Sequence, residues 1–322
     1  MRRALILAAL LSFAAISGGE AQPARWQAEF PLTDFNRSAV AFDEILDGGP
    51  PRDGIPALSD PAFLPAQDEL RIPDREPVVT LEMPGSPARS YPLRYLTWHE
   101  IVNDEIGGVP VAVTFCPLCN SAITFDRRVD GDVLSFGVSG RLRNSDMVMY
   151  DRETESWWQQ ATLEGIIGQH MGRELEPIAT WVESFGAFRD RHSDGLVMAE
   201  PDYPRDYGRN PYRGYDSGAG FFLYSGELPP HGIDALARVV RVGERAWPLE
   251  RVAQAGGVSE AGVSISWSPG QASALDSAAI AEGRDIGNIR VRDAGGQDLA
   301  HDVMFAFAFH AFWPDGEWML GE

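Results

Sequence analysis

The 322-residue sequence contains no lysine, so all 27 of its basic residues are arginine. Without lysine the chain cannot form a Schiff base, anchor pyridoxal phosphate or supply the phosphate-binding lysine of a P-loop. A GC-rich genome, which favours arginine codons, is the simplest explanation for the absence. Whatever its origin, it excludes these classes of enzyme.

Basic charge is scarce as a whole, because 47 acidic residues outnumber the 27 arginines and give a net charge of −20. A surface of this charge repels nucleic acid and anionic lipid. The composition therefore predicts no nucleic-acid partner and no binding to an anionic membrane surface.

Long hydrophobic runs are also missing, apart from one near the N-terminus. Arg2 and Arg3 precede an apolar run over residues 5–16, which is too short to cross a bilayer comfortably. Gly19 and Ala21 supply the small residues of a cleavage site, so we expect a signal peptide over residues 1–21. Its removal takes away two arginines and one glutamate, which leaves 46 acidic and 25 basic residues and a net charge of −21. The prediction is a periplasmic or secreted protein without a membrane span after cleavage; the alternative is an uncleaved anchor.

Cysteine occurs only twice, as Cys116 and Cys119 in the motif C-P-L-C. In an exported protein two cysteines usually form a disulfide, but a loop this short removes little entropy from the unfolded chain. Three interpretations stay open: a thiol–disulfide redox pair, two ligands of a metal site, or an inert disulfide. A thioredoxin-like fold is disfavoured, because residues 120–126 indicate a strand where thioredoxins begin a helix.

A metal site needs further ligands, and the best candidate is His99. It lies on a helix predicted over residues 93–104, directly before the buried strand predicted over residues 109–115 that leads into the cysteines. The alternative is a hydrogen-bonded structural histidine. The string is not the zinc-protease motif H-E-x-x-H, because Asn103 replaces the second histidine. With the soft thioethers of Met147 and Met149 also available, the site favours copper(I) or zinc over magnesium or calcium.

Polar and aromatic side chains on the predicted hairpins after the cysteines are candidates for a ligand pocket. Two β-hairpins are expected there, one around an Asp-Gly turn at residues 130–131 and one around residues 152–155. The ligand-binding candidates are Arg141, Asn144, Asp146, Trp158 and Gln160. The alternative is that these residues cap turns and satisfy buried backbone groups.

The order of motifs predicts a strand-dominated α+β fold with two related halves from an internal duplication. A-R-S-Y-P-L at 88–93 resembles E-R-A-W-P-L at 244–249, and V-A-V-T-F-C-P at 111–117 resembles V-S-I-S-W-S-P at 263–269. We expect an irregular N-terminal extension over residues 22–75, a first repeat over 76–236 and a degenerate second repeat over 237–322. A helix is also expected over residues 180–192. Because Ser268 and Gln271 replace the cysteines in the second repeat, only the first keeps the site.

Several short motifs resemble the domain-of-unknown-function family numbered 3179. They are H-E-I-V-N-D at 99–104, P-V-A-V-T-F-C-P-L-C at 110–119, F-G-V-S-G at 136–140, N-S-D at 144–146, Y-D-R at 150–152, T-E-S at 154–156, W-x-Q at 158–160 and R-D-Y-G at 205–208. The resemblance covers residues 53–215 and thins beyond 237. It implies a family and no mechanism. Asn120 stands where family members commonly have glycine.

The function expected from the sequence is an exported protein whose Cys116–Cys119 pair binds a metal or cycles between dithiol and disulfide, with an unknown substrate. The alternative is a non-catalytic ligand-binding or scaffold module with a structural disulfide. Whether the protein is an enzyme stays open. A redox or metal-delivery protein is the expected kind of partner.

Overall fold

We describe the protein from a computed structural model, which covers residues 21–218 and 222–321. Among the described residues, strands make up 36% and helices, with the 3₁₀ turns included, 16%, so the predicted dominance of strands is confirmed. The sheets take a propeller-like arrangement of five blades. In this part of the chain, 3₁₀ turns lie at Phe42–Glu44, Ala66–Asp68, Tyr215–Ser217 and Ile280–Glu282.

The sheet that carries the cysteines has the order β15-β8-β7-β6-β2. Its strands are Pro177–Ile178, Ser121–Asp126, Val109–Cys116, Ile101–Ile106 and Leu58–Ser59. The three central strands are antiparallel neighbours and are buried over most of their length, as their β-branched and aromatic residues predict. The predicted strand before the cysteines is therefore confirmed as β7.

A second sheet with the order β1-β11-β12-β13-β14 packs its hairpin turn against the cysteine motif. Its strands are Ile45–Asp47, Phe136–Arg143, Asp146–Asp151, Trp157–Gln159 and Gly165–Ile167. A small hairpin of β9 (Arg128–Val129) and β10 (Asp132–Val133) precedes it. Both hairpins expected from the sequence are present.

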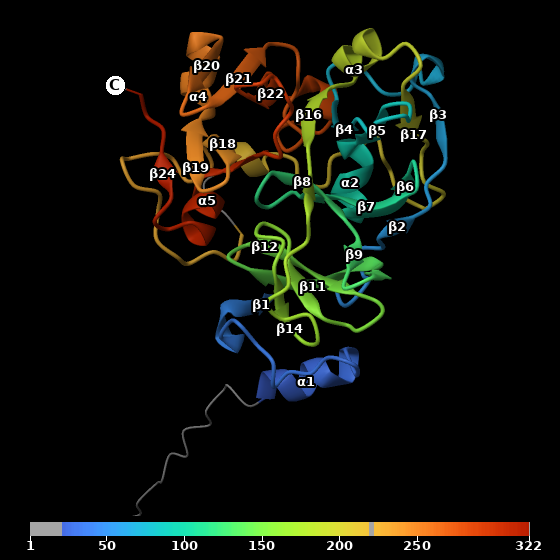
Figure 1. Cartoon of the computed structure of the whole chain (residues 1–322), viewed down its shortest axis with the longest axis vertical. Coiled ribbons are helices and arrows are strands. Elements are labelled where there is room, and N and C mark those ends of the chain that lie inside the picture. The colour runs from blue at the N-terminus through green and yellow to red at the C-terminus, as the bar shows by residue number, and fades with distance from the viewer. Residues whose placement is uncertain (1–20, 219–221, 322) are drawn as a thin grey trace, which may run out of the picture.

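The N-terminal extension is tied to the rest of the molecule by three short strands and one helix. Strands β1, β2 and β3 (Phe63–Pro65) each pair with a strand of a different sheet. The aromatic rings of Trp26, Phe30 and Phe35 surround Trp157 on β13. This cluster holds helix α1 (Ala21–Glu29) against the second sheet (Figure 1).

Two further sheets share one arrangement of strands. The first contains the strand order β16-β4-β5-β17, and the second has the order β23-β18-β19-β24. In each sheet the first two pairings of this order are antiparallel and the third is parallel. The first four are Thr180–Ser184, Pro77–Leu81, Arg89–Pro92 and Leu196–Met198; the second four are Asp302–Phe305, Arg238–Val242, Arg245–Pro248 and Glu317–Trp318. Helices follow the corresponding strands: α2 (Leu93–His99) and α3 (Phe185–Arg191) in the first, α4 (Leu249–Ala255) and α5 (Ala306–Phe312) in the second. A three-stranded sheet of β20 (Gly257–Glu260), β21 (Val263–Ser268) and β22 (Asn288–Asp293) completes the described chain.

Two predicted helices are shorter than expected. The helix predicted over 93–104 ends at His99, because the backbone reverses at Glu100, with φ 59°, and residues Ile101–Ile106 pair with β7 as strand β6. The helix predicted over 180–192 begins only at Phe185, because Thr180–Ser184 pairs with β4. In both cases pairing with a neighbouring strand replaces part of the predicted helix.

The predicted signal peptide lies outside the described residues, except for Ala21 at the start of α1. Within the part of the chain that the structure describes, no helix has the length and apolar character to cross a membrane.

Candidate metal centre at the cysteine motif

The cysteine motif forms the turn between two antiparallel strands. Cys116 ends β7 and pairs directly with Ser121, the first residue of β8, so residues 117–120 must reverse the chain. Asn120 adopts the left-handed conformation with φ 55°, which asparagine tolerates better than most residues. Its Nδ2 donates to the carbonyl of Val303 at 2.7 Å. Asparagine at position 120 therefore adds a side-chain anchor that glycine could not provide.

A second tight turn brings Asp146 to the cysteines. Asn144 and Ser145 both have positive φ, at 52° and 64°, and connect β11 to β12 as a two-residue hairpin turn. The carbonyl of Ser145 accepts weak hydrogen bonds from the thiols of Cys119 at 3.5 Å and Cys116 at 4.0 Å. The next residue, Asp146, therefore begins β12 beside both sulfurs.

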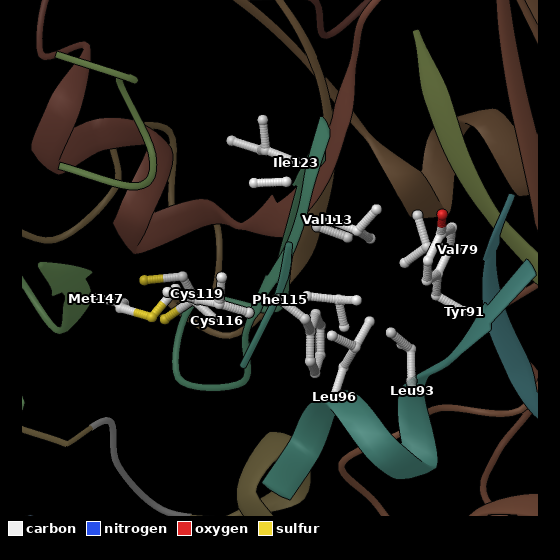
Figure 2. Close-up of a cluster of buried hydrophobic side chains, with 14 of the residues drawn as sticks. Val79, Tyr91, Leu93, Leu96, Val113, Phe115, Cys116, Cys119, Ile123 and Met147 are labelled. Carbon is white, nitrogen blue, oxygen red and sulfur yellow. The ribbon is translucent and has the colours of Figure 1, made fainter. Parts of the chain in front are cut away.

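Cys116, Cys119 and Asp146 form the only group of three or more potential metal-binding side chains among the described residues. One ligand atom from each lies within 4.8 Å of the other two, and the cysteine pair is 4.1 Å apart. Both thiols are free, and all three side chains are at most 2% exposed. Figure 2 shows the two cysteines at one end of the apolar core, with the side chain of Met147 reaching toward them.

The electrostatics of this group are unfavourable without a cation. Burial raises the pKa of both thiols and raises the pKa of Asp146 from 3.8 to about 6. Asp146 Oδ2 accepts hydrogen bonds from Gln159 Nε2 at 2.7 Å and from the amide of Ala161 at 3.0 Å. Its Oδ1 is buried and has no regular hydrogen bond within the described chain, and no arginine there forms an ion pair with it. The thiols of Cys116 and Cys119 beside it act in the direction of lowering the pKa of Asp146, but burial outweighs them. The second carboxylate oxygen is therefore available to a ligand.

Glu100 is a further acidic group at this site, which sequence reasoning missed. Glu100 is 7% exposed, and burial raises its pKa to about 8. The negative charge of the nearby Asp146 adds to this increase, whereas a long hydrogen bond of 3.4 Å from the Tyr212 hydroxyl acts against it. The positive φ that turns it inward is not visible in a sequence. The available signal was its place directly after His99 in a family motif.

A cavity of about 490 Å³ lies beside the cysteine motif. Leu118 of the motif and Glu100 line it, together with Arg141, Met147 and Tyr215. The Tyr215 hydroxyl donates to the carbonyl of Leu118 at 3.0 Å. The cavity therefore gives a small molecule a place next to the cysteine turn.

His99 is not brought to the cysteines. Its Nδ1 bonds the carbonyl of Pro56 at 2.7 Å and its Nε2 bonds the hydroxyl of Tyr207 at 2.6 Å, so both ring nitrogens are occupied. The side chain is fully buried, and burial lowers its pKa. These contacts are those of the hydrogen-bonded structural histidine, and Asp146 takes the place in the cluster that the prediction assigned to His99.

The predicted pocket residues have different roles. Arg141 lines the cavity but is paired with Glu29 and with Asp47, the latter at 2.9 Å. Asn144 forms the hairpin turn described above.

Trp158 is a core residue whose Nε1 donates to Asp151 at 2.9 Å. Gln160 Nε2 donates to Thr114 Oγ1 at 3.0 Å, and Met149 is buried in the core. Of the five candidates, only Asp146 joins the cysteines.

A known family accounts for most of the chain. The profile of a family described as "Protein of unknown function (DUF3179)" matches residues 52–316. The chain belongs to this family. No curated protein and no solved structure matches it. The resemblance noted in the sequence is therefore confirmed, and the match extends through the C-terminal region where the sequence resemblance thins.

Proposed function

We propose that this DUF3179 protein binds one zinc or copper(I) ion through Cys116, Cys119 and Asp146. The observation that carries the proposal is the buried Asp146 Oδ1, which faces two buried thiols and has no regular hydrogen bond within the described chain. Burying a carboxylate with one oxygen unpaired is costly, and a bound cation would offset that cost.

The dimensions of the cluster fit one ion. Zinc–sulfur bonds of about 2.3 Å and zinc–oxygen bonds of about 2.0–2.2 Å place tetrahedral ligand atoms roughly 3.3–3.8 Å from one another. The three ligand atoms of the cluster lie within 4.8 Å of one another, so they would have to approach by up to about 1 Å to bind one ion. Small rotations about χ1 can supply a movement of this size. The tight turns on either side would keep the backbone in place.

The choice between the two metals depends on the third ligand. A carboxylate such as Asp146 favours zinc, whereas the thioether of Met147, which points toward the cysteines in Figure 2, favours copper(I). Bound zinc would act as a Lewis acid beside the cavity, whereas bound copper could carry an electron. Glu100 and the cavity walls would then orient a small ligand and exclude water.

Thiol–disulfide redox is the second candidate, and the separation of 4.1 Å between the cysteines favours it. Small rotations would bring two sulfurs at this separation to bonding distance. Burial opposes it, since exchange needs an accessible thiolate, and both thiols are buried with a raised pKa. For this reason we place metal binding first.

The deciding experiment compares the wild type with the double variant Cys116→Ser/Cys119→Ser. Both proteins are purified anaerobically, and metal content and free thiols are measured. One zinc or copper per wild-type chain, and none in a folded double variant, would support the proposal. A metal-free wild type whose two thiols oxidise and reduce reversibly would favour the redox alternative. A double variant that cannot fold, with a wild type that shows neither property, would make the pair structural.

We infer further that the protein is exported and that its two halves arose by duplication. The basic, apolar and small-residue segments of residues 1–21 support export, and N-terminal sequencing of periplasmic protein should begin near Gln22. Intact Met1 in the cytoplasm would refute export. The shared strand order of the β4 and β18 sheets supports duplication.

A further inference from the structure

The cavity beside the cysteine motif combines apolar and aromatic walls with one buried acid. Its volume of about 490 Å³ lies in the range of small-molecule sites. Its walls include Leu118, Met147 and the rings of Tyr212 and Tyr215, and Glu100 adds a carboxyl group. A ligand that fits this cavity therefore has an apolar body and one group that a carboxylate can bind.

The carboxyl group of Glu100 has an oxygen that no donor of the described residues occupies. Oε1 accepts one long hydrogen bond of 3.4 Å from the Tyr212 hydroxyl, and Oε2 accepts none within that part of the chain. The residue is only 7% exposed, yet Oε2 does not belong to the completely enclosed polar atoms without partners. Since Glu100 lines the cavity, a ligand there can reach this oxygen.

No positive charge of the described chain neutralises this acid. No arginine there forms an ion pair with Glu100, although two arginines line the cavity. Arg141 pairs with Glu29 and Asp47. Arg213 is exposed, so solvent and salt screen its charge. A positive group next to Glu100 would have to come from a ligand.

The neighbouring cysteine site makes the surroundings of the cavity more negative. The charge of Asp146 raises the pKa of Glu100, and the charge of Glu100 raises the pKa of Cys116, so the two sites share one electrostatic environment. A zinc ion held by two thiolates and one carboxylate still leaves one negative charge, and copper(I) leaves two. A cation therefore suits the cavity with the metal bound as well as without it.

Two aromatic rings add to the attraction for a cation. Tyr212 and Tyr215 line the cavity, and no arginine of the described residues lies over either ring. The Tyr215 hydroxyl donates to the carbonyl of Leu118 at 3.0 Å and accepts from the amide of Phe222 at 3.3 Å, which holds this ring beside the cysteine turn. Tyrosine rings attract cations that approach their faces.

We propose that this cavity binds a small organic ammonium ion with an apolar or aromatic body, whose N–H groups donate to Glu100. The body would lie against the tyrosine rings and Leu118. The proposal rests on the proposed metal centre only for the role of the ligand, which would be bound beside the metal. Binding itself needs Glu100 and the walls of the cavity.

Titration calorimetry on the full-length reduced protein, metal-free and loaded with zinc, tests the proposal. The probes share one shape and differ in charge: benzylamine is a cation, benzyl alcohol is neutral and benzoate is an anion. Wild type should bind benzylamine at one saturable site, about tenfold or more tightly than benzyl alcohol, because hydrogen bonds between charged groups are stronger than neutral ones. No binding of benzylamine, equal affinity for benzyl alcohol, or tighter binding of benzoate by the metal-free protein would overturn the proposal.

The two states of the protein separate this proposal from the metal centre. A wild type that takes up no zinc but binds benzylamine would refute the metal centre and support the ammonium site. A wild type that takes up zinc but does not bind benzylamine in either state would refute the ammonium site alone.

Three variants locate the site. Glu100→Gln keeps the shape of the side chain and removes its charge, so benzylamine should bind about tenfold more weakly while benzyl alcohol keeps its affinity. Tyr212→Leu removes an aromatic wall and should weaken both probes, which decides the location if Glu100→Gln does not fold by circular dichroism. Glu105→Gln is the matched control, because Glu105 is an exposed acid on β6 that does not line the cavity.

The location would be wrong if folded Glu100→Gln and Tyr212→Leu both kept the wild-type affinity for benzylamine. It would also be wrong if Glu105→Gln lost as much affinity as Glu100→Gln, because the attraction would then come from the net charge of the surface.

Discussion

The substitution Asp146→Asn should have opposite effects on the metal-free fold and on metal binding. In the metal-free protein Asp146 is buried, and its pKa is raised from 3.8 to about 6. A raised folded-state pKa means that the group lowers stability as pH rises from 3.8 to about 6, and the full cost remains above that range. The shift corresponds to about 3 kcal/mol, since one pKa unit is about 1.4 kcal/mol.

Asparagine keeps a carbonyl oxygen for Gln159 and Ala161 and never ionises. Metal-free Asp146→Asn should therefore be more stable than metal-free wild type at pH 8, by up to about 3 kcal/mol. The difference should vanish below about pH 3, where the wild-type carboxyl is protonated in both states. Urea denaturation at about pH 3 and about pH 8 measures both values.

The same variant should bind zinc more than about 100-fold more weakly, because loss of a direct ligand should cost more than loss of an outer-shell partner. Asp151→Asn is the matched control on the same strand. Every oxygen of Asp151 accepts a hydrogen bond, from Thr154 or from Trp158, so this change should cost about 1–3 kcal/mol and leave zinc binding unchanged. The reasoning would be refuted if metal-free Asp146→Asn were the less stable protein at pH 8, or if it kept wild-type zinc affinity.

Zinc affinity should rise by about 100-fold per pH unit near pH 7, because both buried thiols must lose a proton to bind the metal. A chelator competition series from about pH 6.5 to 8 measures the slope, and a flat profile would argue against thiolate ligands. Gly140→Ala should destabilise the fold strongly, because Gly140 has φ 75° and an added Cβ would lie 2.1 Å from the carbonyl oxygen of Pro50. Gly49→Ala should cost less, because Gly49 has φ 107° but an added Cβ would meet no atom within 4 Å. Thermal unfolding compares the two variants. Trp157→Ala should cost about 3–5 kcal/mol by removing the centre of the aromatic cluster under α1, which urea denaturation measures, and a change below 1 kcal/mol would contradict the packing.

The strand content and the turn at the cysteines were predictable because they depend on local signals. The β-branched run of β7, the apolar run of β12 and the Asp-Gly turn of the β9–β10 hairpin all appear as consecutive residues. The two helix errors have one cause. Each predicted helix was extended over a short segment, residues 101–104 and 180–184, that pairs with a neighbouring strand. Only the tertiary pairing shows this.

The composition of the site was harder to predict than its position. Cys116 and Cys119 were evident as the only cysteines, whereas the third member depended on which hairpin turn reached them. Asp146 was among the pocket candidates but had no metal-ligand signature in the sequence. His99 was preferred because histidine is a common ligand and the chain places it near the motif, yet two hydrogen bonds turn its ring elsewhere.

The second half of the chain lacks the cysteines but holds the cysteine turn in place. The amide of Phe305 donates to the carbonyl of Cys119 at 2.9 Å, and Val303 accepts from the Asn120 side chain. Asp302 binds the start of β8, so three residues of β23 contact the turn and the strand that leaves it. A metal site needs its ligands positioned to within a few tenths of an ångström, and a turn with one free side would not provide this. The C-terminal half therefore has a structural role at the candidate site even though it contains no cysteine, because β23 supports the cysteine turn.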